Sequence, residues 1–219
     1  MTLPDLPVTG ERTHDLVRLE LPPEPARLHL EELFGNANPV ELEIGVGKGR
    51  FILLAAWARR DVNFLGIEVA RKYLERAIDR VGKRGLVNVR LVHAEAYAFL
   101  RDRLPDECLA AIHVYFPDPW PKKRHHKRRL FRPAVVEEFA RVLRPGGLLR
   151  AVTDHPDYAP VIRETMEASP AFEDAGRDAS LWELPGMGDY TTLGVTNFEI
   201  KYRREGRPIQ RFAWRRRNP

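Results

Sequence analysis

The sequence predicts an α/β fold with a doubly wound, mostly parallel sheet and a C-terminal antiparallel hairpin. From Pro39 onward, short apolar runs alternate with amphipathic stretches, which is the pattern of strands and helices that follow one another. Strands separated by helices of this length pair in parallel, so ligands are expected outside their carboxyl ends. Near the C-terminus, apolar residues recur at every second position in two segments, 196–202 and 210–215, which indicates a hairpin.

The expected elements of the sheet follow in order along the chain. Strands are expected at VELEI (40–44), VNFLGIE (62–68), VNVRLVH (87–93), LAAIHVYF (109–116) and LLRAVT (148–153). Helices are expected between them at residues 49–60, 71–82, 96–103 and 133–144, and Pro145-Gly146-Gly147 ends the last of these. Residues 169–195, before the hairpin, are rich in loop-forming residues and are expected to be a mobile surface segment.

Residues 1–38 are expected to form an N-terminal extension that is partly disordered. Residues 1–39 contain six of the 18 prolines and show no sustained periodicity. Residues 39–219 then form one folded domain. The one cysteine, Cys108, excludes an internal disulfide and paired-cysteine zinc sites. No apolar run approaches the ~18 residues of a membrane span, and the start lacks the layout of a signal peptide, so a cytoplasmic protein is expected.

The basic residues are concentrated in two segments, 122–132 and 201–217. These segments hold seven and eight Lys or Arg, with Glu205 as their one acid, whereas the remaining sequence has more acids than bases. The net charge of +5 therefore hides two regions of opposite sign. Two solvated basic faces would explain this pattern, but two runs with so few acids favour nucleic acid as the partner.

A glycine-rich turn follows the first expected strand. Gly45, Gly47 and Gly49 let the backbone approach a ligand closely and expose the N-terminus of the next helix. Glu68 ends the second expected strand, where its carboxylate can accept hydrogen bonds from the two hydroxyls of a ribose. Arg50 stands where the dinucleotide fingerprint requires glycine, so a nucleoside cofactor is favoured over one with a pyrophosphate.

An acid stands at or near the end of each of the first four expected strands: Glu43, Glu68, Glu95 and Asp118. One such acid is usually a helix cap, but four at matched ends of parallel strands meet at one edge of the sheet. An acid before the glycine turn repels a diphosphate and attracts a cationic group. S-adenosyl-L-methionine has a ribose, an amino-bearing base and a positive charge, and it suits this edge. Its expected ligands are Glu43, Gly45, Gly47, Gly49, Glu68, Glu95 and Asp118.

The segment YFPDPWPKKRHHKRRL (115–130) joins this edge to the first basic run. Its three prolines favour a rigid extended loop that holds Asp118 and Trp120 beside the pocket. Trp120 is either a stacking surface for a base or a structural residue, and the basic side chains after it are placed to contact phosphates. Adjacent His125 and His126 do not share a helix face, so no metal site is expected.

Motifs between residues 39 and 217 resemble those of the bacterial tRNA (guanine-N7-)-methyltransferase family. They are LEIGVGKG, FLGIE, FPDPWPKKRHHKRRL, TDHPDYA and the terminal TNFE. The resemblance implies a class I S-adenosylmethionine-dependent methyltransferase domain over 39–219, which methylates N7 of a guanosine in the variable loop of tRNA. It implies a catalytic role for Asp118. It also implies substrate contacts by Lys122, Asp154, Thr196, Asn197, Phe198 and Glu199.

The sequence departs from the family pattern at three places. Glu95 stands where Asp or Asn is usual, His155-Pro156 replaces a turn that contains Trp, and Pro208 stands where the last strand usually has His. The first departure puts a longer side chain at the expected adenine site. The other two lie among the expected RNA contacts.

The expected chemistry agrees with this resemblance. N7 of guanine carries a free lone pair, so no general base is needed, and alignment with the methyl group can supply up to roughly 7–11 kcal/mol. A carboxylate such as Asp118 or Glu199 either orients the base or stabilises the positive charge that develops on it. The alternatives are a nicotinamide-dependent oxidoreductase on the same sheet plan and a non-catalytic RNA-binding module. The sequence is compatible with a monomer or a homodimer.

Overall fold

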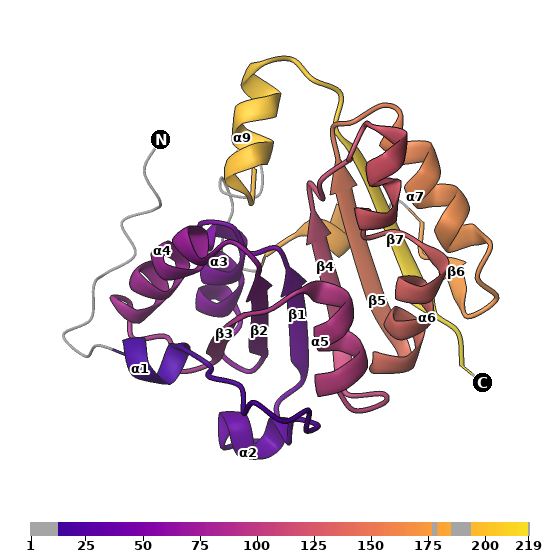
Figure 1. Cartoon of the computed structure of the whole chain (residues 1–219). Helices are drawn as coiled ribbons and strands as arrows, with labels where there is room; N and C mark the ends of the chain where they lie inside the picture. The colour runs from indigo at the N-terminus through magenta and orange to yellow at the C-terminus, as the bar shows by residue number, and fades with distance from the viewer. Residues whose placement is uncertain (1–12, 177–178, 185–193, 219) are drawn as a thin grey trace.

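The computed structural model, which describes residues 13–176, 179–184 and 194–218, contains a seven-stranded sheet with helices on both faces (Figure 1). The strands are β1 (Val40–Ile44), β2 (Asn63–Glu68), β3 (Val89–His93), β4 (Leu109–Tyr115), β5 (Leu143–Thr153), β6 (Phe172–Asp174) and β7 (Gln210–Arg216). Their order across the sheet is β3-β2-β1-β4-β5-β7-β6. The first five strands pair in parallel, as predicted, and β7 is antiparallel to both of its neighbours.

The helices divide between the two faces of the sheet. They are α1 (His14–Val17), α2 (Leu30–Phe34), α3 (Arg50–Ala58), α4 (Arg71–Gly82), α5 (Ala96–Arg103), α6 (Pro133–Val142), α7 (Tyr158–Glu167) and α9 (Asn197–Arg204), with 3-10 turns η1 (Lys123–Arg128) and η2 (Ala179–Trp182). One hydrophobic core lies between the sheet and α1, α3 and α4, and the other lies under α2, α5, α6 and α7. Since both faces are covered, every residue of β1 and β2 is buried.

The described part of the N-terminal extension packs on the domain. Val17 is fully buried beside α4, and Arg18 forms an isolated parallel bridge with Leu91 of β3. Phe34 at the end of α2 is 8% exposed and packs in the second core. Residues 1–12 lie outside the described residues, so partial disorder of the extension stays a prediction.

The predicted C-terminal hairpin is wrong in its first strand, because residues 197–204 form helix α9. The Thr196 hydroxyl accepts a hydrogen bond from the Glu199 N–H at 3.0 Å, and the Glu199 carboxylate accepts one from the Val195 N–H at 2.9 Å. These two hydrogen bonds resemble a capping box, although the carboxylate bonds to the residue before the cap, and they start a helix despite the period-two apolar pattern. The last strand, β7, exists as predicted but pairs with β5 and β6.

The segment 169–195, expected to be a mobile loop, includes regular structure. Its described part contains β6 and η2. Residues 177–178 and 185–193 lie outside the described residues.

A chain of four polar side chains, of which all but Arg59 are buried, crosses the face of the sheet that α3 covers. Arg59 donates two hydrogen bonds of 2.8 Å to Glu41, and His113 Nε2 lies 2.9 Å from the same carboxylate. His113 Nδ1 lies 3.1 Å from the Tyr115 hydroxyl. Burial lowers the pKa of His113 to about 4 and outweighs the opposing effect of Glu41. Neutral His113 therefore donates from Nε2 to Glu41 and accepts the Tyr115 hydroxyl proton at Nδ1.

This histidine predicts a pH dependence of stability. A group that is neutral when folded but protonates when unfolded weakens the fold as the pH falls from about 6.5 toward about 4. His113→Gln keeps a donor and an acceptor, so its free energy of unfolding should fall less than that of the wild type between about pH 7 and about pH 5. Urea unfolding at both pH values measures this. His29→Gln, at an exposed histidine, is the control, and equal pH slopes for wild type and His113→Gln would contradict the prediction.

Candidate active site at the carboxyl edge of the sheet

The glycine turn lies at the carboxyl end of β1, directly before α3. Gly45, Gly47 and Gly49 have φ angles of 79°, 53° and 73°, a backbone region that favours glycine. A Cβ added at Gly45 or Gly47 would meet no atom within 4 Å, whereas one added at Gly49 would lie 2.8 Å from the Ala77 Cβ of α4. The first two glycines therefore leave open space above the turn, and the third lets α3 pack against α4.

Glu43 is buried beneath this turn with one oxygen unsatisfied. Its exposed fraction is 3%, and its Oε2 has no hydrogen-bond partner within the described part of the chain. Burial raises the pKa of Glu43 well above its usual range, the charge of Glu68 adds to this effect, and a hydrogen bond from the Ile52 backbone opposes it. A positively charged ligand group would satisfy the oxygen and stabilise the ionised carboxylate, so the site fits the expected cationic cofactor.

Glu68 holds the glycine turn in place. Its Oε2 accepts a hydrogen bond from the Gly47 N–H at 2.8 Å, and its Oε1 accepts one from the Ala70 N–H at 2.9 Å. The side chain therefore links the end of β2 to the turn after β1. Each carboxylate oxygen can accept more than one hydrogen bond, so these contacts leave capacity for ribose hydroxyls.

Glu95 is a helix cap in this structure. Its carboxylate accepts hydrogen bonds from the Tyr97 N–H at 3.1 Å and the Ala98 N–H at 2.9 Å, which starts α5. The residue is exposed after the end of β3. Capping is the simpler interpretation of such an acid, and it accounts for Glu95 without a ligand.

The loop that carries Asp118 is strained and braced. Phe116 and Trp120, on either side of the Pro-Asp-Pro sequence, have φ angles of 54° and 43°. Such a conformation costs roughly 1–3 kcal/mol for a residue other than glycine, so other contacts must hold it. The Phe116 N–H bonds to the Val152 carbonyl at 2.7 Å, and Arg129 Nε donates to the Pro119 carbonyl at 2.8 Å. The result is an accessible Asp118 carboxylate on a fixed loop.

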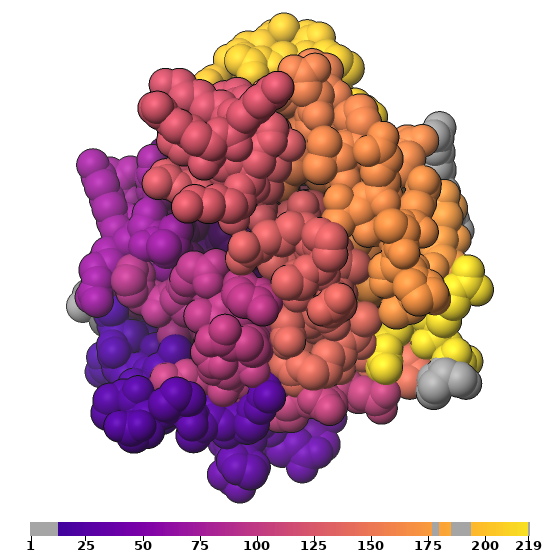
Figure 2. All heavy atoms as spheres, turned by 45° about the vertical axis from the view of Figure 1, so that its right-hand side comes forward, coloured from indigo at the N-terminus to yellow at the C-terminus, as the bar shows by residue number. Residues whose placement is uncertain are grey.

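The first basic segment divides into bracing and exposed residues. Arg128 lies 5.0 Å from the centre of the Trp120 ring, and Arg129 lies at the same distance from the Tyr158 ring. Trp120 therefore has a structural contact. Figure 2 shows the rose-coloured segment around residue 125 standing out below the yellow α9. Its exposed cations are Lys122, Lys123, Arg124 and Lys127, in addition to Arg128.

Three aromatic rings join this loop to α9, which stands beyond the carboxyl ends of the strands (Figure 1). Phe116 lies 5.4 Å from Tyr202 and 6.1 Å from Phe198, and the last two rings stack at 5.7 Å. Arg207 lies over Tyr202 at 4.4 Å, whereas Phe198 is 50% exposed. Phe116 and Tyr202 were not predicted from the sequence as part of the site. The sequence signal for this cluster was the spacing of Phe198 and Tyr202, which lie four residues, or about one helical turn, apart.

Asp154 also belongs to this group. Its carboxylate accepts a 2.9 Å hydrogen bond from Arg207, after the end of β5. Burial raises the pKa of Tyr202, and the charges of Asp154 and Asp118 add to this shift. The two aspartates therefore act on one tyrosine from neighbouring strand ends.

Glu199 is an internal anchor for α9. It is 4% exposed, and its carboxylate pairs with Arg203 at 2.7 Å and with Arg211 of β7. Asn197 and Phe198 are exposed on the same helix, and Thr196 is buried as its cap. The expected substrate residues of this stretch therefore differ in access: two face outward, and two build the helix start.

The described residues contain no group of three or more His, Cys, Asp or Glu that would hold a metal ion. Within the same residues, no helix is long and apolar enough to cross a membrane.

Solved structures similar to this chain include several methyltransferases. The aminoglycoside resistance methyltransferase NpmB1 matches with a TM-score of 0.55 and 18% identity over 88% of this chain and 94% of that chain. A mutant of the 16S rRNA (adenine(1408)-N(1))-methyltransferase from Catenulisporales acidiphilia, with cosubstrate SAM, matches with a TM-score of 0.56 and 16% identity over 85% and 89%. At such identities the likeness concerns the fold, and it confirms the predicted class.

Sequence comparisons are closer. A family model described as a putative methyltransferase matches residues 37–212. The tRNA (guanine-N(7)-)-methyltransferase of Nocardia farcinica is 38% identical over 192 residues, which are 85% of this chain and 71% of that protein. The one from Cupriavidus necator is 37% identical over 201 residues, or 91% and 74%. This chain therefore belongs to the tRNA (guanine-N(7)-)-methyltransferase family.

Proposed function

We propose that this protein transfers a methyl group from S-adenosylmethionine to N7 of a guanosine in the variable loop of tRNA. The observation that carries the proposal is the buried, unsatisfied Glu43 oxygen beneath an open glycine turn, close to an edge that also bears basic segments. Family membership supports the reaction. If the protein were a nicotinamide oxidoreductase, Glu43 would lie near the pyrophosphate of the cofactor, which a carboxylate repels. If it were only an RNA-binding module, the Glu43 oxygen would have no partner. A tRNA substrate also favours a cytoplasmic location.

The residues that would hold the cofactor surround the glycine turn. S-adenosylmethionine supplies a methyl group on a positively charged sulfur when it is bound. Glu43 would attract its cationic part, Glu68 would accept hydrogen bonds from its ribose, and the turn at Gly45 and Gly47 would leave room for it. Glu95 caps α5, so any contact that it makes with the cofactor would come from that capping position.

The reaction would depend on alignment at the Asp118 loop. Guanine N7 would accept the methyl group that the cofactor supplies, using its own lone pair, and the purine would become cationic as the methyl group leaves the sulfur. The accessible Asp118 carboxylate on its braced loop is suited to hold the base and to stabilise that charge. Phe198, half exposed above the stacked Tyr202, is suited to stack on a base.

The remaining expected substrate residues take different parts in this proposal. Lys122 is exposed in the same loop as Asp118 and is suited to a phosphate or base contact. Asp154 would need to exchange its Arg207 partner for RNA. Thr196 and Glu199 would affect RNA binding only by holding α9 in place, because both are buried, Thr196 in the helix cap and Glu199 in ion pairs.

Nucleoside analysis tests the proposed reaction. Incubation of unmodified tRNA with labelled S-adenosylmethionine should yield labelled 7-methylguanosine, and digestion of the product should place the label in the variable loop. Label in another nucleoside would contradict the N7 assignment. Label in another tRNA region would contradict only the position.

Glu68→Gln should weaken cofactor binding. It removes a charged acceptor, and hydrogen bonds to charged groups contribute about 1.5–3 kcal/mol each, so affinity for S-adenosylmethionine should fall roughly 10-fold or more. Isothermal titration calorimetry measures this. Asp79→Asn on exposed α4 surface is the matched control. Unchanged affinity in Glu68→Gln would limit Glu68 to shaping the turn.

Asp118→Asn separates charge stabilisation from orientation. Asn keeps the shape and hydrogen-bonding capacity, so if the charge matters, the single-turnover rate at saturating cofactor and tRNA should fall about 10²–10³-fold. The exposed residue Asp61, before β2, provides the control Asp61→Asn. A near-wild-type rate in Asp118→Asn, with weaker binding, would assign Asp118 to orientation.

Charge reversal of Lys123 and Lys127 should weaken tRNA binding. Both are exposed cations, whereas Arg129 is tied to the loop through its hydrogen bond to Pro119. Each lost phosphate contact should flatten the log-log dependence of affinity on salt by roughly 0.7–0.9. Filter binding across salt concentrations measures the slope, and Arg144→Glu at the opposite end of β5 is the control. A slope equal to that of the control would show that this segment is only a solvated face.

A further inference from the structure

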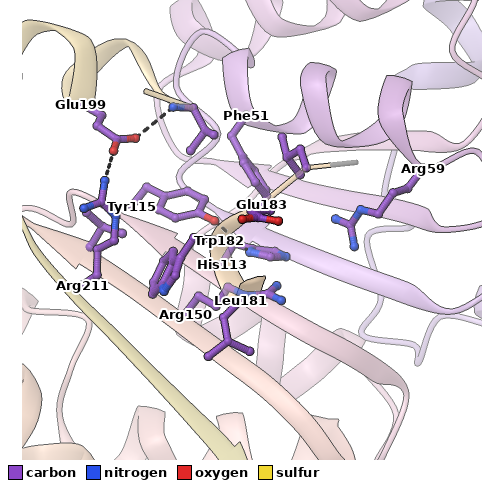
Figure 3. A pocket seen from close by; sticks show the side chains of 13 residues that line it. Phe51, Arg59, His113, Tyr115, Arg150, Leu181, Trp182, Glu183, Glu199 and Arg211 are labelled. Carbon is purple, nitrogen blue, oxygen red and sulfur yellow. Dashed lines mark hydrogen bonds and ion pairs between the residues drawn. The ribbon is translucent and has the colours of Figure 1, made fainter. Parts of the chain in front are cut away.

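A second pocket lies on the face of the sheet that α3 covers, beneath residues 181–184 (Figure 3). Its volume is about 50 Å³, enough for a group of a few heavy atoms. None of the proposed cofactor ligands is among its described lining residues. The pocket adjoins the carboxyl edge, because Tyr115 and Val152 at the ends of β4 and β5 line it together with Glu199 of α9.

Three arginines from different elements line this pocket. Arg59 comes from the end of α3, Arg150 from β5 and Arg211 from β7. Arg59 is held by Glu41 through two hydrogen bonds of 2.8 Å, and Arg211 pairs with Glu199. Two of the three guanidinium groups therefore already have a carboxylate partner.

Arg150 has no such partner. Its guanidinium makes no hydrogen bond or ion pair with any residue that the structure describes, and its Nε is buried. The Nε of Arg59 is likewise buried without an acceptor. One N–H donor on each of these two arginines is therefore removed from water without an acceptor. A buried donor without a partner is unfavourable, so an added acceptor in the pocket would be stabilising.

The other polar groups of the pocket do not meet this need. Neutral His113 donates to Glu41, and the Tyr115 hydroxyl proton is directed to His113. The carboxylate of Glu199 is shared by two arginines. Glu183 lies at the pocket and makes no ion pair with a described residue, so it is the one competing carboxylate that the test must address.

We propose that this pocket binds a small oxyanion, such as inorganic phosphate, with Arg150 as its principal ligand. The guanidinium groups supply charged donors in a partly enclosed space, which strengthens their attraction to an anion. The anion would join β5 to the segment 181–184 above it. Val195 and Glu199 line the same pocket, so occupancy would also support the start of α9.

Thermal unfolding in inorganic phosphate tests the proposal, with ionic strength held constant by potassium chloride. The unfolding temperature of the wild type should rise and saturate, and Arg150→Met should lose this saturable rise. Arg144→Met, an exposed arginine on the same strand, should keep it. An equal phosphate response in Arg150→Met and wild type, or no saturable response in the wild type, would overturn the proposal.

Two further variants keep the test decisive. Arg150→Lys keeps the charge but loses the planar donor geometry, so phosphate binding should weaken without vanishing. Glu183→Gln should tighten phosphate binding, because it removes a nearby negative charge. If Glu183 is instead the natural partner of Arg150, Glu183→Gln should lower the unfolding temperature without phosphate and leave phosphate binding no tighter. That outcome would overturn the proposal.

The oxyanion could come from solution or from a phosphate of bound tRNA. The Kd for tRNA separates the two sources. A free anion predicts saturable phosphate stabilisation and the same tRNA Kd in Arg150→Met and Arg144→Met. An RNA phosphate predicts a higher Kd in Arg150→Met alone and competition between phosphate and tRNA. If Arg150→Met keeps both the saturable phosphate stabilisation and the wild-type tRNA Kd, neither source of the oxyanion is supported and the proposal is wrong.

Discussion

The proposed active edge depends on a carboxylate that is buried where the central strand β1 meets the glycine turn. Glu43 lies in a strand flanked by β2 and β4, with helices over both faces of the sheet, so water does not solvate its charge. Its Oε2 lacks a hydrogen-bond partner among the residues described. An unpaired buried carboxylate is unfavourable, and the Cβ positions of Gly45 and Gly47, in the turn that directly follows Glu43, are open.

The parts around Glu43 are fixed by contacts that come from distant parts of the chain. Glu68 joins the turn to β2, and Arg129 holds the Pro119 carbonyl of the strained loop. Glu199 ties α9 to β7 through Arg211. Such bracing keeps the proposed cofactor edge, the Asp118 loop and α9 in a set arrangement before a ligand arrives. Preorganisation of this kind suits a methyl transfer whose main requirement is alignment.

Much of this arrangement could be predicted from the sequence. Apolar runs identify the five parallel strands because both faces of a parallel sheet are buried, and the four acids follow from where those strands end. The segment 196–202 was predicted to be a strand because its apolar residues recur at every second position. The pair Thr196 and Glu199, which is also visible in the sequence, instead starts a helix. Local capping chemistry was the stronger of the two signals.

Other features depend on tertiary contacts and have no local signal. Basic residues look alike in a sequence, yet Arg129 braces the Trp120 loop through a hydrogen bond, while Lys123 and Lys127 are exposed. Nothing in the sequence indicated that Arg150 lacks a partner, because its environment is formed by α3, β5, β7 and residues 181–184. Pairing of buried charges is decided by which strands become neighbours.

The proton balance of cofactor binding tests the role of Glu43 most directly. Since burial raises the pKa of Glu43, a bound cation should lower it again and release a proton. Calorimetric titration with S-adenosylmethionine at a series of pH values, in buffers with different ionisation enthalpies, measures this release. The account predicts proton release by the wild type that is absent or much smaller in Glu43→Gln, together with weaker binding. Equal proton release and equal affinity in the two proteins would contradict it.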